Sequence, residues 1–225
     1  MKEKTFVRAL LSTVAVLATA IAVITFSIGL PIYFRPFYYM QIEPLGIEEA
    51  TGYSREEIIE GYDEVLDYLT RPGGEFGAGV FKYSESGASH FDDCKVLFTL
   101  NAVAFVICAM FIVLVVYLER KRGARLCRPL GLSPYSFAGG VTLFTFATLG
   151  IFVSVDFDRA FRIFHAVLFP GKDNWLFDPR LDEIILAMPS DFFMNAAILI
   201  ASSIILICIV LLAVGTVRAV RLKRK

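Results

Sequence analysis

The sequence predicts an all-α membrane protein with four transmembrane helices and a mostly helical extracytoplasmic cap. Three observations support this: four long stretches lack any charge, basic and acidic residues alternate by segment, and the acidic segments are too long for simple connections. Of the 225 residues, 56% are hydrophobic and 20% are charged. This hydrophobicity excludes a disordered chain. The zero net charge excludes a nucleic-acid binder that works through a basic surface, so no nucleic-acid partner is expected.

Each uncharged stretch is long enough to cross a bilayer. A hydrocarbon core of about 30 Å needs about 20 apolar residues, and a helix satisfies its own backbone groups in lipid. We expect spans at approximately residues 9–30, 96–118, 135–155 and 192–217. The third span has the lowest hydropathy because it is rich in Gly and Thr, which are common where membrane helices pack closely. The alternatives are a buried soluble helix for the third span and a cleaved signal peptide for the first, whose apolar run is long for a signal core.

The charges predict the orientation of the spans. The N-terminus, the loop after the second span and the C-terminus hold 13 of the 22 Lys and Arg residues, against only Glu3 and Glu119. By contrast, residues 35–95 carry 13 acidic and 5 basic residues, and residues 156–191 carry 7 and 4. The positive-inside rule therefore places both termini in the cytoplasm and both acidic segments outside. We expect a multi-pass protein of the cell membrane.

The two acidic segments, residues 31–95 and 156–191, are expected to form the cap, within a single membrane domain of residues 1–225. The sequence Ser54-Arg55-Glu56-Glu57 is a capping box, with Ser as N-cap and Glu three residues later. Apolar residues then recur at helical spacing up to Leu69. Pro72 and the two glycines after it end this predicted helix.

The chain has only two histidines, His90 and His165, and both fall in the cap segments close to span ends. Acidic residues lie near each in the sequence: Glu85, Asp92 and Asp93 for the first, Asp158 and Asp178 for the second. An imidazole titrates near pH 6.5, so it can accept and return a proton. A carboxylate on the other ring nitrogen would fix its tautomer. The alternative for each histidine alone is a surface or interfacial residue.

The cysteines and the other potential metal ligands carry a weaker signal. The four cysteines form no CxxC pair and no disulfide framework. Cys94 could be a nucleophile, but a lone cysteine at a helix start is more often inert packing. A metal site built from His90, His165, Asp93 and Asp178 is conceivable, yet their spacing matches no metal motif. We therefore expect no metal and no cofactor.

Two motifs resemble those of a bacterial family of small membrane proteins. The first lies in residues 82–95 and contains the His-x-x-Asp sequence at residues 90–93. The second lies in residues 164–179 and ends in Trp-x-Phe-Asp-Pro at residues 175–179. With the segment 182–193, the capped helix and the four spans, nearly the whole chain is similar to the lipoprotein intramolecular transacylase family.

This resemblance implies an activity. The family enzyme has four spans and an extracellular cap, and it moves an acyl chain from the sn-2 hydroxyl of a lipoprotein's diacylglyceryl group to the α-amine of its N-terminal cysteine. The product is a lyso-form lipoprotein. The implied partners are a diacylated lipoprotein and membrane lipid. This sequence departs from the family pattern at Ser86-Gly87, where an Arg-Glu pair is expected, and at Cys94, where a small aliphatic residue is usual.

The resemblance also implies which residues form the site. His90 and His165 match the catalytic positions, and the remaining candidates support the histidines or bind the substrate. The supporting residues are Asp93, Asp178, Glu85 and Lys95, and the substrate-binding residues are Trp175, Phe164, Phe169, Phe177 and Arg162. Lys95, Arg162 and Asn174 are also candidate oxyanion donors. For these aromatic and charged residues the alternative is an interfacial or headgroup-level role.

The implied reaction suits these residues because the nucleophile belongs to the substrate. Consistently, the chain contains no G-x-S-x-G nucleophile elbow. The protein must supply orientation, a base and an acid, and it must exclude water that would hydrolyse the acyl chain. Two non-enzymatic alternatives remain. A lipid transporter is disfavoured because the spans contain no ionisable Asp, Glu, Lys, Arg or His. A binding partner of an exported protein would not depend on both histidines.

Overall fold

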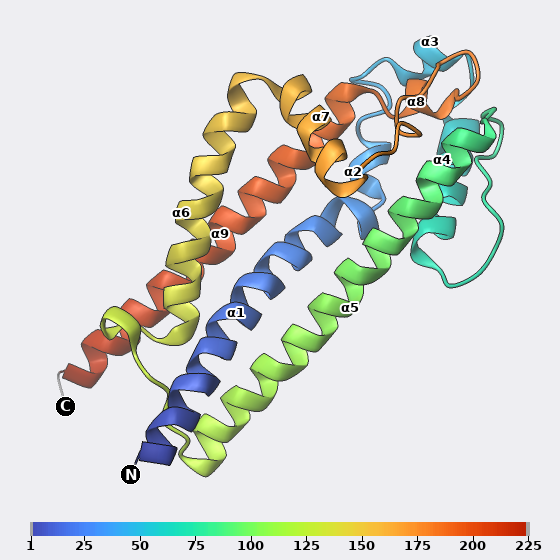
Figure 1. Ribbon diagram of the computed structural model, residues 1–225. Coiled ribbons are helices and arrows are strands. Elements are labelled where there is room, and N and C mark those ends of the chain that lie inside the picture. Colours follow the sequence, from blue (N-terminus) through green and yellow to red (C-terminus); the bar gives the residue numbers. More distant parts are fainter. Residues whose placement is uncertain (1, 224–225) are drawn as a thin grey trace. The chain divides into compact units, whose positions relative to one another are not determined.

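The computed structural model describes residues 2–223, and its regular secondary structure within that range is entirely helical (Figure 1). Side chains are described for residues 5–217. The basic side chains that carry the orientation argument at the two termini therefore lie outside the described residues, apart from Arg8. The predicted all-α fold class is confirmed.

Four helices are long and apolar enough to span a bilayer: α1 (Lys2–Tyr33), α5 (Glu85–Arg122), α6 (Pro134–Val155) and α9 (Ser190–Lys223). Each contains one of the expected uncharged stretches. Helix α5 has 38 residues, about 57 Å of helix at 1.5 Å per residue, so it is longer than a bilayer core requires. Because Asp92, Asp93 and Lys95 are charged, we place the first turns of α5 outside the hydrocarbon, before the uncharged stretch 96–118.

Shorter helices join these four. Helices α2 (Pro36–Tyr39), α3 (Ile47–Thr51) and α4 (Arg55–Thr70) lie between α1 and α5 in the sequence. The 3₁₀ helix η1 (Pro129–Gly131) precedes α6, and α7 (Phe157–Leu168) and α8 (Ile184–Ala187) lie between α6 and α9. The sequence analysis placed the residues of α7 in the cap segment 156–191 without assigning a helix to them.

The capping box predicted at Ser54 is present at the start of α4. The Ser54 hydroxyl accepts a hydrogen bond from the Glu57 backbone N–H, and the Glu57 carboxylate accepts one from the Ser54 N–H at 2.8 Å. The helix ends at Thr70, before the Pro and Gly residues that were expected to stop it. Its apolar side chains are buried, so this amphipathic helix was predicted correctly from start to end.

The chain divides into two compact units, which we describe separately. The bundle unit comprises residues 2–28, 102–151 and 200–223, and the cap unit comprises residues 29–101 and 152–199. In the bundle unit, Val23, Ile204 and Cys208 form a buried cluster. Small residues bring α6 close to α9: a Cβ on Gly139 would lie 3.1 Å from Leu211 Cβ, and the Ser136 hydroxyl donates to the Leu211 carbonyl at 3.0 Å.

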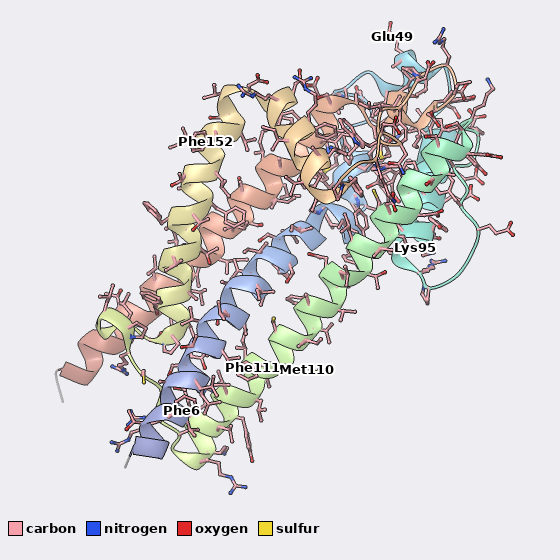
Figure 2. All side chains as sticks on the ribbon, in the orientation of Figure 1. Phe6, Glu49, Lys95, Met110, Phe111 and Phe152 are labelled. Atoms are coloured by element: carbon pink, nitrogen blue, oxygen red, sulfur yellow. The ribbon has the colours of Figure 1, made fainter. Side chains whose placement is uncertain are left out.

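Large apolar side chains cover the outside of the bundle helices. Phe6 on α1 is 68% exposed and Met110 on α5 is 60% exposed (Figure 2). Of the most hydrophobic windows of α5 and α9, only 6% and 11% of the residues are buried inside the protein. Such a surface would be unstable in water and is normal in lipid. The protein is therefore a multi-pass membrane protein.

The cap unit has an aromatic core under α4. The rings of Tyr38 and Tyr62 stack with centroids 3.7 Å apart, and Phe192 packs edge-on against Tyr38 at 5.4 Å. The Tyr38 hydroxyl is buried and donates to the Ala187 carbonyl of α8 at 2.9 Å. This bond satisfies a polar atom that would otherwise be costly to bury.

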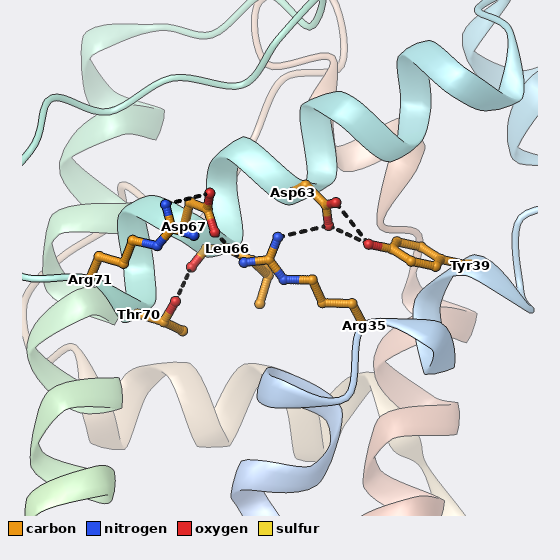
Figure 3. Close-up of polar contacts among 7 residues, drawn as sticks. All are labelled: Arg35, Tyr39, Asp63, Leu66, Asp67, Thr70 and Arg71. Carbon is orange, nitrogen blue, oxygen red and sulfur yellow. Dashed lines mark hydrogen bonds and ion pairs between the residues drawn. The ribbon is translucent and has the colours of Figure 1, made fainter.

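An ion-pair network fastens α4 to the segment that follows α1 (Figure 3). Arg35 pairs with Asp63 at 3.1 Å and also with Asp67 one turn later. Tyr39 donates its hydroxyl hydrogen to Asp63 at 2.7 Å, and Arg71 pairs with Asp67 at 3.0 Å. The acidic face of α4 is thus partly neutralised by neighbours and is not only a solvated surface.

Candidate active site

The start of α5 is fixed by Asp182, and this fixes the position of His90. The Ser84 hydroxyl caps α5 by accepting from the Gly87 N–H at 2.9 Å, while the Ser84 N–H and hydroxyl donate to Asp182 at 2.8 and 2.9 Å. A Cβ on Gly87 would collide with the Asp182 carboxylate. A larger residue at position 87 would therefore require the Asp182 side chain to move.

His165 lies on the buried face of α7. Asp156 caps this helix by accepting from the Arg159 N–H at 2.9 Å. Most of the exposed residues of α7 are apolar, whereas His165 near its C-terminal end is only 7% exposed. The His165 Nδ1–H donates to the Phe161 carbonyl one turn earlier, at 2.8 Å. This bond leaves the Nε2 lone pair of the neutral ring available to accept a proton.

The cap unit brings the two histidines together. Their ring centroids are 5.8 Å apart with an interplanar angle of 34°, although they are 75 positions apart in the sequence. His90 is 6% exposed, so both rings are buried. The two rings are therefore close enough to act on different atoms of one molecule.

Aromatic side chains surround the pair, and they include all four that the sequence proposed for substrate binding. Phe169 lies beside both histidines, with its ring centroid 4.8 Å from His90 and 5.7 Å from His165, and Phe177 lies 5.5 Å from His90. Trp175 stacks on His165 at 4.6 Å, and Phe164 meets that ring edge-on at 5.3 Å. The surroundings of both rings are therefore largely apolar.

Burial keeps both imidazoles neutral at neutral pH. It lowers the pKa of His90 to about 4, with a further lowering from the neighbouring His165, while the Asp93 carboxylate acts in the opposite direction. Burial also lowers the pKa of His165, and its bond to the Phe161 carbonyl opposes this shift. The uncharged ring is the form that accepts a proton, so the pair is ready for acid–base chemistry.

The two nitrogens of His90 have different surroundings. Nε2 lies 3.4 Å from the Cys94 Sγ, one helical turn later, whereas Nδ1 is buried and has no hydrogen-bond partner among the described residues. Burial raises the pKa of the Cys94 thiol to about 12, so this thiol is protonated and a poor nucleophile. The expectation that Cys94 is inert packing is therefore supported by its surroundings.

A polar triad flanks His90. Asp93 accepts from Lys172 Nζ at 2.6 Å and from Asn174 Nδ2 at 3.0 Å. These bonds lower the pKa of Asp93, with Lys172 the main cause. Sequence reasoning identified Asp93 but missed Lys172, and it considered Asn174 only as an oxyanion donor. The signal available was the polar run of residues 172–174 directly before Trp175.

Several proposed residues do not join the histidines. The expected carboxylate partner Asp178 instead pairs with Arg180 at 2.7 Å, and the group that holds His165 Nδ1 is a backbone carbonyl. Lys95 donates to the Gly73 carbonyl at 2.6 Å and lies over the Tyr68 ring. Glu85 stands in the first turn of α5 and Arg162 is exposed on α7. No group of three His, Cys, Asp or Glu within the described residues could hold a metal ion.

Four bilayer-length helices and a buried pair of histidines define the class: an integral membrane protein with two imidazoles close together. The particular family follows from comparison. The sequence profile of "Lipoprotein intramolecular transacylase Lit" matches residues 13–193, and this chain belongs to that family.

Solved structures agree with this assignment. The membrane integral lipoprotein intramolecular transacylase Lit from Bacillus cereus superposes with a TM-score of 0.84 at 26% identity, covering 96% of each chain. Two variants of that enzyme, with one histidine replaced by arginine or by alanine, superpose with TM-scores of 0.77 at 25% identity. They cover 96% of this chain, and 92% and 94% of their own chains. No curated protein matches.

Proposed function

We propose that this protein moves the sn-2 acyl chain of a diacylated lipoprotein to the α-amine of its N-terminal cysteine, through His90 and His165. The observation that carries the proposal is the pair of buried, neutral imidazoles 5.8 Å apart within a ring of aromatic side chains. Membership of the transacylase family supports the same reaction.

The reaction balances without a cofactor. The substrate amine attacks the ester carbonyl carbon, a C–N bond forms, and the bond from that carbon to the sn-2 oxygen breaks. One proton leaves the amine and one reaches the sn-2 oxygen. Attack closes an eight-membered ring of N, Cα, Cβ, S, two glyceryl carbons, the ester oxygen and the acyl carbon. One histidine accepts the amine proton, and the other protonates the leaving oxygen or stabilises the oxyanion.

The remaining task is to fold a flexible substrate into this ring. Holding reacting atoms in a near-attack geometry can contribute up to about 7–11 kcal/mol. Trp175, Phe164, Phe169 and Phe177 offer flat apolar surfaces beside the histidines for this purpose. The same rings keep water from the ester. Asp93 acts through its charge on His90, and the exposed Arg162 suits a lipid headgroup.

The proposed location is the bacterial cell membrane, with both termini in the cytoplasm and the cap unit outside. The distribution of basic residues supports this orientation. Cysteine accessibility tests it with two exposed positions, Glu49→Cys on α3 (Figure 2) and Lys121→Cys at the end of α5. An impermeant reagent applied to intact cells should label the first and not the second. The reverse labelling pattern would show that the protein has the opposite orientation in the membrane.

The proposed activity is tested by mass spectrometry of lipoprotein N-termini in a host without its own transacylase. Expression of this protein should convert diacyl lipoproteins to the lyso-form. If the protein accumulates in the membrane and no lyso-form is detected, the activity assigned to this family member is wrong, and a non-enzymatic membrane role takes its place.

A further inference from the structure

We propose that Asn174 is a positioning residue that holds His90 in the tautomer with hydrogen on Nδ1, so that Nε2 is the nitrogen that exchanges protons with the substrate. This inference rests on the proposed function for its catalytic consequence. The hydrogen-bonding arrangement itself can be tested without any activity.

The first observation is a pair of unsatisfied atoms. Within the described residues, His90 Nδ1 and Asn174 Oδ1 are two of only three buried side-chain oxygen or nitrogen atoms without a hydrogen-bond partner. Each such atom costs about 1–3 kcal/mol. The two side chains are neighbours, because the Asn174 amide nitrogen lies 3.4 Å from the hydroxyl of Ser89, directly before His90, and 3.0 Å from Asp93, one helical turn after it. A single hydrogen bond between them would satisfy both atoms.

The second observation is that the orientation of the Asn174 amide is defined. Its Nδ2 donates to Asp93 at 3.0 Å and lies 3.4 Å from the Ser89 hydroxyl oxygen. Lys172 holds Asp93 from the other side at 2.6 Å. Because the carboxylate can only accept, the amide nitrogen must face it. The Asn174 oxygen therefore faces away from Asp93 and is available as an acceptor.

The third observation concerns the other nitrogen of His90. Nε2 is 3.4 Å from the Cys94 Sγ, and the buried thiol retains its hydrogen. A protonated thiol can donate to Nε2 or accept from it. The acceptor at Asn174 Oδ1 selects the first arrangement, in which Nε2 carries the lone pair and Nδ1 carries the hydrogen. A donor at Nδ1 and an acceptor at Asn174 Oδ1 are complementary. Substrate would displace the weakly bound thiol from Nε2.

The resulting chain of contacts runs from Lys172 through Asp93 and Asn174 to His90. The titratable groups around the His90 ring are His165 on α7, Asp93 and Cys94 on α5, and Lys172 in the segment after α7. Asn174 is the neutral residue in this chain of contacts. Asp93 holds its amide nitrogen, and this fixes the position of the amide oxygen relative to the imidazole. A tautomer held in advance costs nothing at the moment of reaction.

The experiment is nitrogen NMR of ¹⁵N-histidine-labelled protein in detergent micelles. The chain has two histidines, and His165→Ala assigns their signals. Wild type should show His90 with hydrogen on Nδ1, and Asn174→Ala should shift it toward the other tautomer. Asn195→Ala is the matched control, because this amide bonds to Gln41 in the same unit and should leave the His90 pattern unchanged.

Asn174→Gln serves as the conservative variant, because it keeps both the amide donor for Asp93 and an acceptor for Nδ1. It should retain the wild-type tautomer of His90. In the transacylation assay, Asn174→Ala should lose about 10- to 100-fold in rate, as expected for a misplaced group, and Asn174→Gln should recover part of it.

The outcomes separate the two levels of inference. If Asn174→Ala keeps the wild-type His90 signals, the positioning role is wrong, whatever happens to activity. In that case, a loss of rate would mean that Asn174 contacts the substrate directly. If the tautomer shifts as expected but wild type forms no lyso-lipoprotein, the positioning holds and the proposed function fails.

Discussion

His90 and His165 are equally buried, but their ring nitrogens are held in different ways. His165 donates from Nδ1 to a carbonyl of its own helix, so the backbone fixes its tautomer. Among the described residues, His90 Nδ1 has no hydrogen-bond partner, and Nε2 lies beside the Cys94 thiol. A hydrogen bond to a backbone carbonyl persists when neighbouring side chains are substituted, whereas a contact with a side chain is lost when that side chain is replaced. The chemistry at His90 should therefore be more sensitive to its neighbours than the chemistry at His165.

The strongest test of this pair is to remove each ring. His90→Ala and His165→Ala should each reduce lyso-lipoprotein formation by about 10²–10⁴, the usual effect of losing a general acid or base. Glu49→Ala, on the exposed surface of α3, is the control and should keep wild-type activity. The measurement is the ratio of lyso-form to diacyl lipoprotein by mass spectrometry. Full activity in either histidine variant would show that the two rings do not act together.

The two histidines should also make stability depend on pH. Their pKa values are lower in the folded state than the ordinary value of 6.5, so the unfolded chain binds a proton first as the pH falls. The free energy of unfolding should then decrease below about pH 6.5. With a pKa of about 4, His90 accounts for about 2 kcal/mol of this decrease at pH 5.

Thermal unfolding in detergent at pH 7.5 and pH 5 measures the effect. His90→Asn should lose less stability between the two pH values than wild type. His165→Asn should also lose less stability than wild type over the same range. A larger acid sensitivity in His90→Asn than in wild type would show that His90 is charged in the folded protein, and would contradict the lowered pKa.

Trp175 tests the aromatic surroundings of one histidine only. It stacks on His165 and donates from its indole N–H to the Lys172 carbonyl at 3.1 Å. Trp175→Ala should lower the rate by about tenfold through lost positioning, with the proton-transfer groups intact. Trp175→Phe keeps a ring and should recover most of the rate. If both variants were as inactive as His165→Ala, the role of Trp175 would not be limited to positioning the substrate.

Cys94→Ala should have the smallest effect. The proposed nucleophile is the substrate amine, so activity should stay within about threefold of wild type. The same mass-spectrometric ratio reports it. An inactive Cys94→Ala variant beside an active His90→Ala variant would replace the proposed mechanism with an acyl-enzyme on Cys94.

Much of the fold follows from the sequence for simple physical reasons. Uncharged stretches of 21 or more residues must be helical in a bilayer, because no other local structure satisfies their backbone. The helix after Ser54 was equally predictable, since its cap, its periodicity and its stop signals are local. Helix α7 was missed because its aromatic residues fit both a loop at the interface and an amphipathic helix.

The candidate site was only partly predictable. The histidines and the aromatic residues were named from the sequence because they belong to two motifs, but their partners were not. Asp178 lies 13 residues after His165, yet it pairs with Arg180, while Lys172 reaches Asp93 across 79 positions. Which carboxylate meets which cation depends on the path of the chain between α7 and α8, and no local pattern encodes that path.

The sequence by itself determined the membrane class, the four spans and the residue types able to do acid–base chemistry, because hydrophobicity and capping act over a few neighbouring residues. The tertiary structure alone decided that His90 and His165 are 5.8 Å apart, that both rings are buried and that the Asp182 carboxylate packs against Gly87. These features arise from contacts between distant segments, and burial in such contacts sets the proton affinity of each ring.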